Sequence, residues 1–164
     1  MNISLPSAVQ LMNRFGEEEI TQLAVKSPRV PIESDLLMAA AKGEPLDDWS
    51  PEDLATAVDA LARIADAISR ARSEVSFYLR FRKTGEDAPD WVTDDLPELA
   101  RYHLQGTAVE DSTMRLRYRD IIKRLEKLAT EDEARGASEA GDSGLQIQHA
   151  PRLFNRKRDR KSVV

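Results

Sequence analysis

Two histidines are the residues of this chain best suited to acid–base or metal chemistry. His103 lies beside Leu104 in a predicted helix, so we interpret it as a packing or surface residue. His149 has no second histidine nearby and the chain has no cysteine, so a transition-metal site is not expected. The acidic residues lack the Asp-x-Asp-x-Asp-Gly register of a calcium loop, and no glycine-rich phosphate loop is present. The sequence therefore predicts no catalytic residue, no metal site and no cofactor.

One short segment, Gly141-Asp142-Ser143-Gly144, resembles the nucleophile motif of chymotrypsin-like proteases. In those enzymes the serine depends on a β-barrel, a buried aspartate and a histidine far upstream. Here the segment falls within residues 136–144, where Gly, Ser and Ala are typical of a flexible linker. We therefore interpret the segment as linker and expect a protein that is not an enzyme.

The strongest predicted element is a long helix over residues 51–83. Ser50 is placed to cap this helix, Pro51 suits its first position, and no further glycine or proline occurs before Gly85. Apolar residues recur at alternating spacings of four and three, which indicates the core-facing side of a bundle or, as the less favoured alternative, a coiled-coil seam. This stripe comprises Leu54, Val58, Leu61, Ala65, Ile68, Arg72, Val75 and Leu79.

Shorter helices precede and follow the long one. Ser4 or Ser7 is expected to cap the first helix, which ends at Phe15 with Gly16 in a left-handed conformation. Asp94 or Asp95 is expected to cap a later helix that follows an acidic loop. We therefore predict an all-α fold, a small helical bundle around one long central helix, with an extended C-terminal arm. The shorter helices are expected over residues 17–25, 35–42, 96–105 and 113–134, and the acidic loop over residues 84–94.

Aromatic and basic residues gather at the end of the long helix, over residues 77–83. Such a cluster could bind nucleic acid by base stacking and phosphate pairing. We favour a second interpretation, in which the cations suit a helix C-terminus and the aromatic side chains pack inward. The cluster consists of Phe77, Tyr78, Arg80, Phe81, Arg82 and Lys83.

The distribution of charge divides the chain into two parts. Residues 1–133 hold 17 Lys and Arg against 26 Asp and Glu, whereas residues 134–164 hold 7 against 3. We therefore predict a helical body over residues 1–134, and a flexible linker with an extended basic arm over residues 135–164. The arm alternates apolar and polar residues from Leu145 to His149, as does a strand that joins the sheet of a partner. The residues expected to bind a partner are Leu145, Ile147, Leu153, Phe154, Arg156, Lys157, Arg158, Arg160 and Lys161.

The sequence also carries expectations about location. The first residues lack the positive region and the apolar run of a signal peptide. No stretch approaches the roughly 18 apolar residues of a membrane-spanning helix. We therefore expect a soluble protein, made in a cytoplasm, that does not bind a membrane.

Four segments of the body carry a family resemblance. The most specific is Arg14-Phe15-Gly16-Glu17, and the others lie within residues 67–82, 96–104 and 117–126. In this order and spacing they resemble a family of small proteins of Mu-like phages and prophages, which is related in fold to the head–tail adaptor (connector) proteins of long-tailed phages. The resemblance covers most of residues 9–130 but not the C-terminal arm.

This resemblance implies a specific assembly. Such proteins form a ring, usually dodecameric, under the portal protein, in the neck of the virion after assembly in the host cytoplasm. The ring surrounds the channel for double-stranded DNA, its C-terminal segments dock on the portal, and a stopper or tail-terminator protein binds its other side. Arg14, Phe15 and Gly16 are then expected to fix the fold or the interface between ring subunits. The alternative is a nucleic-acid-binding phage regulatory protein that uses its basic tail.

Overall fold

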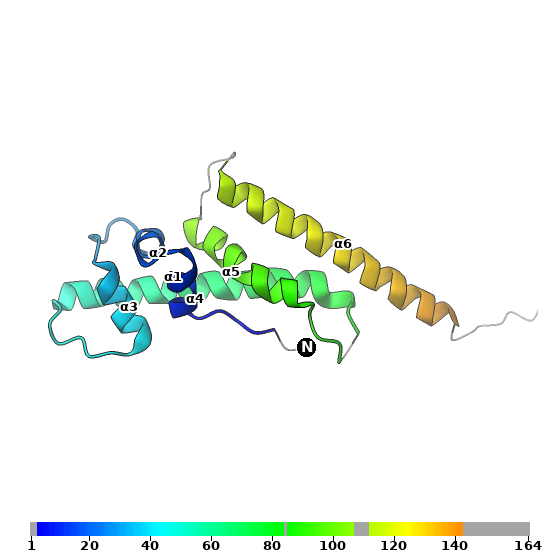
Figure 1. Ribbon diagram of the computed structural model, residues 1–164, viewed down its shortest axis with the longest axis horizontal. Helices are drawn as coiled ribbons and strands as arrows, with labels where there is room; N and C mark the ends of the chain where they lie inside the picture. The colour runs from blue at the N-terminus through cyan, green and yellow to red at the C-terminus, as the bar shows by residue number, and fades with distance from the viewer. Residues whose placement is uncertain (1–2, 84, 107–111, 143–164) are drawn as a thin grey trace, which may run out of the picture.

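The computed structural model describes residues 3–83, 85–106 and 112–142, and in this part of the chain it contains helices and no strand. The central helix is α4, and the other helices pack along it (Figure 1). The predicted all-α fold around one long helix is confirmed. The helices are α1 (Ala8–Phe15), α2 (Glu17–Ala24), α3 (Ser34–Lys42), α4 (Pro51–Tyr78), the short 3-10 helix η1 (Leu79–Phe81), α5 (Asp90–Gln105) and α6 (Thr113–Asp142).

Capping residues determine where the first helices begin and end. The Oγ of Ser7 accepts a hydrogen bond from the backbone N–H of Gln10 at 3.2 Å, and the Ser7 N–H donates to the Gln10 side chain at 2.8 Å. Gly16, with a φ of 100°, ends α1 and starts α2, a conformation in which other residues are strained. Ser50 caps α4 by accepting from the N–H of Asp53 at 3.1 Å. The predicted roles of Ser7, Gly16 and Ser50 in the fold are confirmed.

The predicted stripe on α4 only partly coincides with the side that faces the core. Val75 and Leu79 are buried, and Leu54, Leu61 and Ile68 are partly buried against the core. The prediction was wrong for Val58, which is 65% exposed, and for Ala65 and Arg72, which are also exposed. The buried side is instead rich in alanine. Small side chains let neighbouring helices approach α4 closely, and the large side chains of those helices, such as Leu96 and Leu99, fill the core. The buried residues of α4 are Thr56, Ala57, Ala60, Ile64, Ala67, Ala71 and Val75.

The fifth helix begins earlier than its sequence predicted. It starts at Asp90, within the expected acidic loop, and continues through Pro97. Val92 is buried in the core, which explains why the helix extends over these residues. Asp95, expected as a cap, is instead a buried residue inside the helix. Tertiary packing therefore outweighed the proline signal, which ordinarily favours a helix start near Pro97.

The last helix continues beyond its predicted end. Helix α6 runs to Asp142 and so crosses the proposed boundary at residues 134 and 135 and most of the proposed linker. Its buried apolar residues Ile121 and Leu125 belong to the core. The helix lies over α5 and the C-terminal part of α4, and its last turns extend past the other helices (Figure 1).

Candidate functional site

The corner between α1 and α2 is attached to α5 through the most specific sequence motif. The guanidinium of Arg101 in α5 lies 4.7 Å from the centre of the Phe15 ring, and that of Arg14 lies 5.7 Å from it. Arg14 also forms an ion pair with Glu98 of α5 at 3.8 Å. These contacts within one chain give Arg14, Phe15 and Gly16 a clear role in the fold. Their role at an interface between copies stays a prediction.

A polar cluster joins α4, α5 and α6 at the position of Glu74. This carboxylate accepts a hydrogen bond from the Tyr118 hydroxyl at 2.6 Å and lies 2.8 Å from Nε2 of His103. Tyr118 also stacks on Tyr102, with ring centres 3.8 Å apart. Burial alone would raise the pKa of Glu74, but the hydrogen bonds from His103 and Tyr118 outweigh it and lower that pKa below 4.5. Burial and the Glu74 carboxylate raise the pKa of Tyr118.

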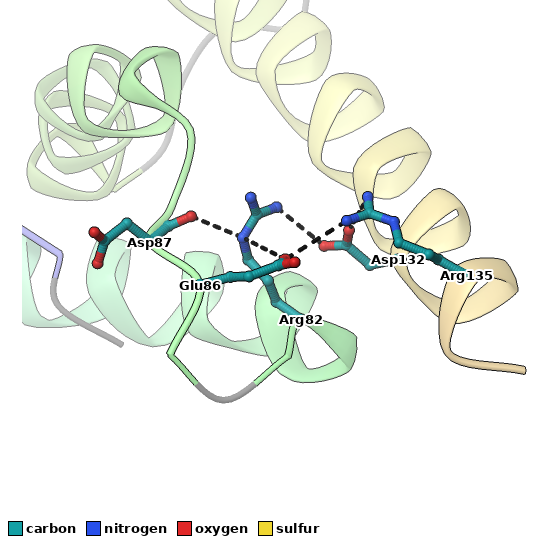
Figure 2. A network of polar contacts seen from close by, with 5 residues as sticks. All are labelled: Arg82, Glu86, Asp87, Asp132 and Arg135. Atoms are coloured by element: carbon teal, nitrogen blue, oxygen red, sulfur yellow. Dashed lines mark hydrogen bonds and ion pairs between the residues drawn. The ribbon is translucent and has the colours of Figure 1, made fainter. Parts of the chain in front are cut away.

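A second polar network fastens the later part of α6 to the segment after η1 (Figure 2). Asp132 is 3% exposed, and its carboxylate accepts from Arg82 at 3.2 Å and from Arg135 at 2.8 Å. Arg82 also donates to the backbone carbonyl of Asp87 at 2.8 Å, and Arg135 pairs with Glu86 at 3.5 Å. A buried carboxylate without such partners would be strongly destabilising. This network therefore holds the later part of α6 against the segment after η1.

A third contact lies between α5 and α6. Arg124 of α6 forms an ion pair with the buried Asp95, and its guanidinium lies 5.1 Å from the Trp91 ring. Together with the clusters around Glu74 and Asp132, it attaches α6 to the bundle at three places along its length. His103, interpreted from the sequence as a packing or surface residue, belongs to one of these attachments.

The aromatic cluster at the end of α4 differs from the favoured interpretation. Phe77 is 58% exposed, so this ring does not pack inward. Arg80 lies between two rings, 4.0 Å from the centre of Phe77 and 4.3 Å from that of Phe81, and donates to the Phe77 carbonyl at 2.7 Å. Tyr78 and Arg82 do turn toward the bundle. The cluster therefore presents one cation stacked between aromatic rings on the surface.

An open groove between α2 and α4 contains three cations, each of which has a partner within the chain. Lys26 donates to the carbonyl of Gln105 at 3.0 Å, at the end of α5. Arg63 donates to the carbonyl of Ala24 at 3.3 Å, at the end of α2, and Arg29 pairs with Asp59. Cations at helix C-termini stabilise the helices. The three cations of this groove are therefore explained by their role in stabilising the fold.

Two charged regions of the body were not recognised from the sequence. Residues 113–127, the first half of α6, hold six basic and two acidic residues, although the whole body is acidic. Residues 33–53, which include α3 and the turn into α4, hold seven acidic residues and one lysine. A charge count over shorter windows would have found both regions.

The predicted partner-binding arm, over residues 145–161, lies outside the described residues, and so does His149. Ser143 of the protease-like segment lies outside them as well. Within residues 3–83, 85–106 and 112–136, where side chains are described, no group of three or more acidic or histidine side chains is arranged to hold a metal ion. In the described part of the chain, no helix is long and apolar enough to cross a membrane.

Comparison with known proteins gives one match. The model of the family described as Bacteriophage Mu, Gp36 matches residues 7–143. This range includes all six α-helices and ends at the last described turn of α6. No curated protein and no solved structure matches the chain.

Proposed function

The chain belongs to the Bacteriophage Mu Gp36 family and is a Mu-like phage protein, and from this premise we propose that it is a structural head–tail adaptor. Copies of the chain form a dodecameric ring under the portal, surround the channel for double-stranded DNA, and join the head to the tail-side stopper or tail-terminator protein. The protein acts in the neck of the virion after assembly in the host cytoplasm. The family match over residues 7–143 is the observation that carries this proposal.

The use of polar side chains in the bundle supports a structural role. Glu74, His103 and Tyr118 bond to one another across three helices, and Asp132 is held by two arginines. These groups stabilise the positions of the helices relative to one another. An assembly protein needs such a rigid body to present fixed surfaces to its neighbours.

The C-terminal arm is proposed to dock on the portal. The last turns of helix α6 extend past the other helices of the bundle (Figure 1). The arm then has apolar residues at alternate positions, Leu145 and Ile147, and a basic end. An extended segment of this kind can add a strand to a sheet of the partner. The acidic charge of residues 1–133 suits a channel through which DNA slides without binding.

Electron microscopy of assembled particles tests the proposal. We expect a ring of this chain between portal and tail. Deletion of residues 145–164 is expected to abolish attachment to portals while leaving the helical content of the purified protein unchanged, because the deletion begins after α6. Particles with no density for the chain in the neck would refute the adaptor assignment.

The same deletion separates the adaptor from the alternative, a nucleic-acid-binding phage regulator. A regulator would bind duplex DNA as a free protein, and its affinity would fall steeply with salt because counterions are released. Deletion of residues 145–164 would then remove DNA binding. An adaptor is expected to show weak DNA binding that the deletion leaves nearly unchanged.

A further inference from the structure

The outward side of α6 is a basic surface with an apolar residue beside the cations. Arg119, Lys123 and Lys127 are exposed and recur every four residues, so they share one side of the helix. Leu116 lies two turns before Lys123 on this side and is 47% exposed. We call these four residues the basic face of α6. Arg119 and Lys123 form no ion pair with any described residue, while Lys127 pairs with Glu131 at 3.8 Å.

The basic face is held in a fixed position by the opposite side of the same helix. Ile121 and Leu125 are buried in the core, and Tyr118 and Arg124 are bonded to α4 and α5. A face on a rigid helix loses little conformational freedom when a partner binds. The basic face therefore has the properties of a preformed interaction surface.

A region of complementary charge lies elsewhere on the same molecule. We call residues 33–53 the acidic end, and it lies at the N-terminal end of α4, whereas α6 lies over the C-terminal half (Figure 1). Asp47, Asp48 and Glu52 are exposed there and form no ion pair with any described residue. The acidic end and the basic face are therefore separate surfaces, so one copy can offer each of them to a different neighbour.

We propose that the basic face of α6 binds the acidic end of a second copy of this chain. Two different, complementary surfaces on one molecule give a head-to-tail contact, which closes into a ring when its rotation permits. Complementary charge fixes the register of such a contact and disfavours wrong pairings. The inference rests on the proposed ring and names the surfaces that join its subunits.

The observations favour a second copy over duplex DNA as the occupant. Leu116 is a large apolar side chain beside the cations, and an apolar group is expected at the centre of a protein interface. Residues 1–133 as a whole carry nine more acidic than basic residues, which disfavours DNA as a partner. The acidic end is complementary in charge to the basic face, and every copy of the chain carries both surfaces.

Charge exchange between the two surfaces tests this contact in full-length protein. One variant reverses the basic face, Arg119→Glu with Lys123→Glu, and a second reverses the acidic end, Asp47→Lys with Asp48→Lys. Each variant alone is expected to lower the number of copies per particle about tenfold or more, because like charges then face each other. Coexpression of the two variants is expected to restore assembly, since each then offers its neighbour a complementary surface.

A matched control has the same change of charge elsewhere. Arg70→Glu with Arg72→Glu alters two exposed residues of α4 that belong to neither surface, and we expect copy number within about twofold of the unaltered chain. Circular dichroism of each purified variant checks that the helices are retained. An equal loss in the control, or failure of the coexpressed pair to assemble, would overturn the inference.

Engineered cysteines measure the contact directly, because the natural chain contains no cysteine. Chains with Asp48→Cys and Lys123→Cys are expected to give a ladder of disulfide-linked multimers from assembled particles, and chains with Asp48→Cys and Arg72→Cys are not. A neck ring without the ladder would overturn this inference alone, whereas the absence of any ring would refute the proposed function. Loss of duplex DNA binding on reversal of the basic face, with normal assembly, would assign that face to DNA instead.

Discussion

At the scale of single residues, the polar groups of the bundle act mainly by holding helices together. Glu74 is the clearest case, because one carboxylate bonds to His103 of α5 and Tyr118 of α6. The sequence offered His103 as a possible chemical group, and its partner Glu74 lies 29 positions away on another helix. The distance in sequence explains why the pair was not predicted.

Replacement of Glu74 tests this role through its pH dependence. The pKa of Glu74 is lowered in the folded protein, so the carboxylate stabilises the fold above its ordinary value of 4.5 and loses this effect as the pH falls below it. Glu74→Gln is expected to lower the free energy of unfolding by about 1–2 kcal/mol near neutral pH. Urea denaturation should show the difference from the unaltered protein shrinking in acid. The exposed Glu133→Gln is the control, and a difference independent of pH would contradict this explanation.

At the scale of elements, glycine acts in opposite ways at the two ends of the body. Gly16 has a positive φ between α1 and α2, whereas Gly136 lies inside α6 without one. Composition predicted that Gly136 would begin a flexible linker, but the helix continues to Asp142. A single glycine lowers helix stability by only about 1 kcal/mol, so it does not end a helix whose neighbours favour it.

Alanine substitutions at these two glycines are expected to have opposite effects. No atom lies within 4 Å of an added Cβ at either position, so backbone conformation alone decides the result. Gly16→Ala should lower the free energy of unfolding by about 1–2 kcal/mol, because a positive φ is strained in a residue that has a side chain. Gly136→Ala should raise helix stability by about 0.5–1 kcal/mol. Circular dichroism with urea titration measures both, and destabilisation by Gly136→Ala would argue against a helix there.

At the scale of the whole molecule, the bundle depends on the close approach of the neighbouring helices to α4. The side of α4 that faces the core has alanine at four of its buried positions, including Ala60 and Ala67. The larger apolar residues Leu54, Leu61 and Ile68 lie at the margin of the core, partly exposed. On the opposite side of the same helix, Val58 and Ala65 are exposed to solvent.

A pair of leucine substitutions distinguishes the observed core face from the stripe expected from the sequence. Ala60→Leu adds volume to a site that is 1% exposed, and overpacking is expected to lower the free energy of unfolding by about 1–3 kcal/mol. Ala65→Leu alters an exposed position and should change stability by no more than about 0.5 kcal/mol. Thermal unfolding of both proteins checks the assignment, which would be wrong if Ala65→Leu were the more destabilising change.

The sequence by itself determined the helical class, the long helix, the helix end at Gly16 and the cap at Ser50, because these features depend on neighbouring residues. It left the first cap open between Ser4 and Ser7, and the structure shows Ser7. It also determined the phage family through a pattern that spans most of the body. Only the tertiary structure decided which side of α4 is buried, where α5 begins and which charges are paired. Those outcomes depend on contacts between segments far apart in the chain, such as Arg82 with Asp132, and local pattern contains no information about them. The structure also decided that the acidic end and the basic face, which have opposite charge, lie on separate surfaces of the molecule.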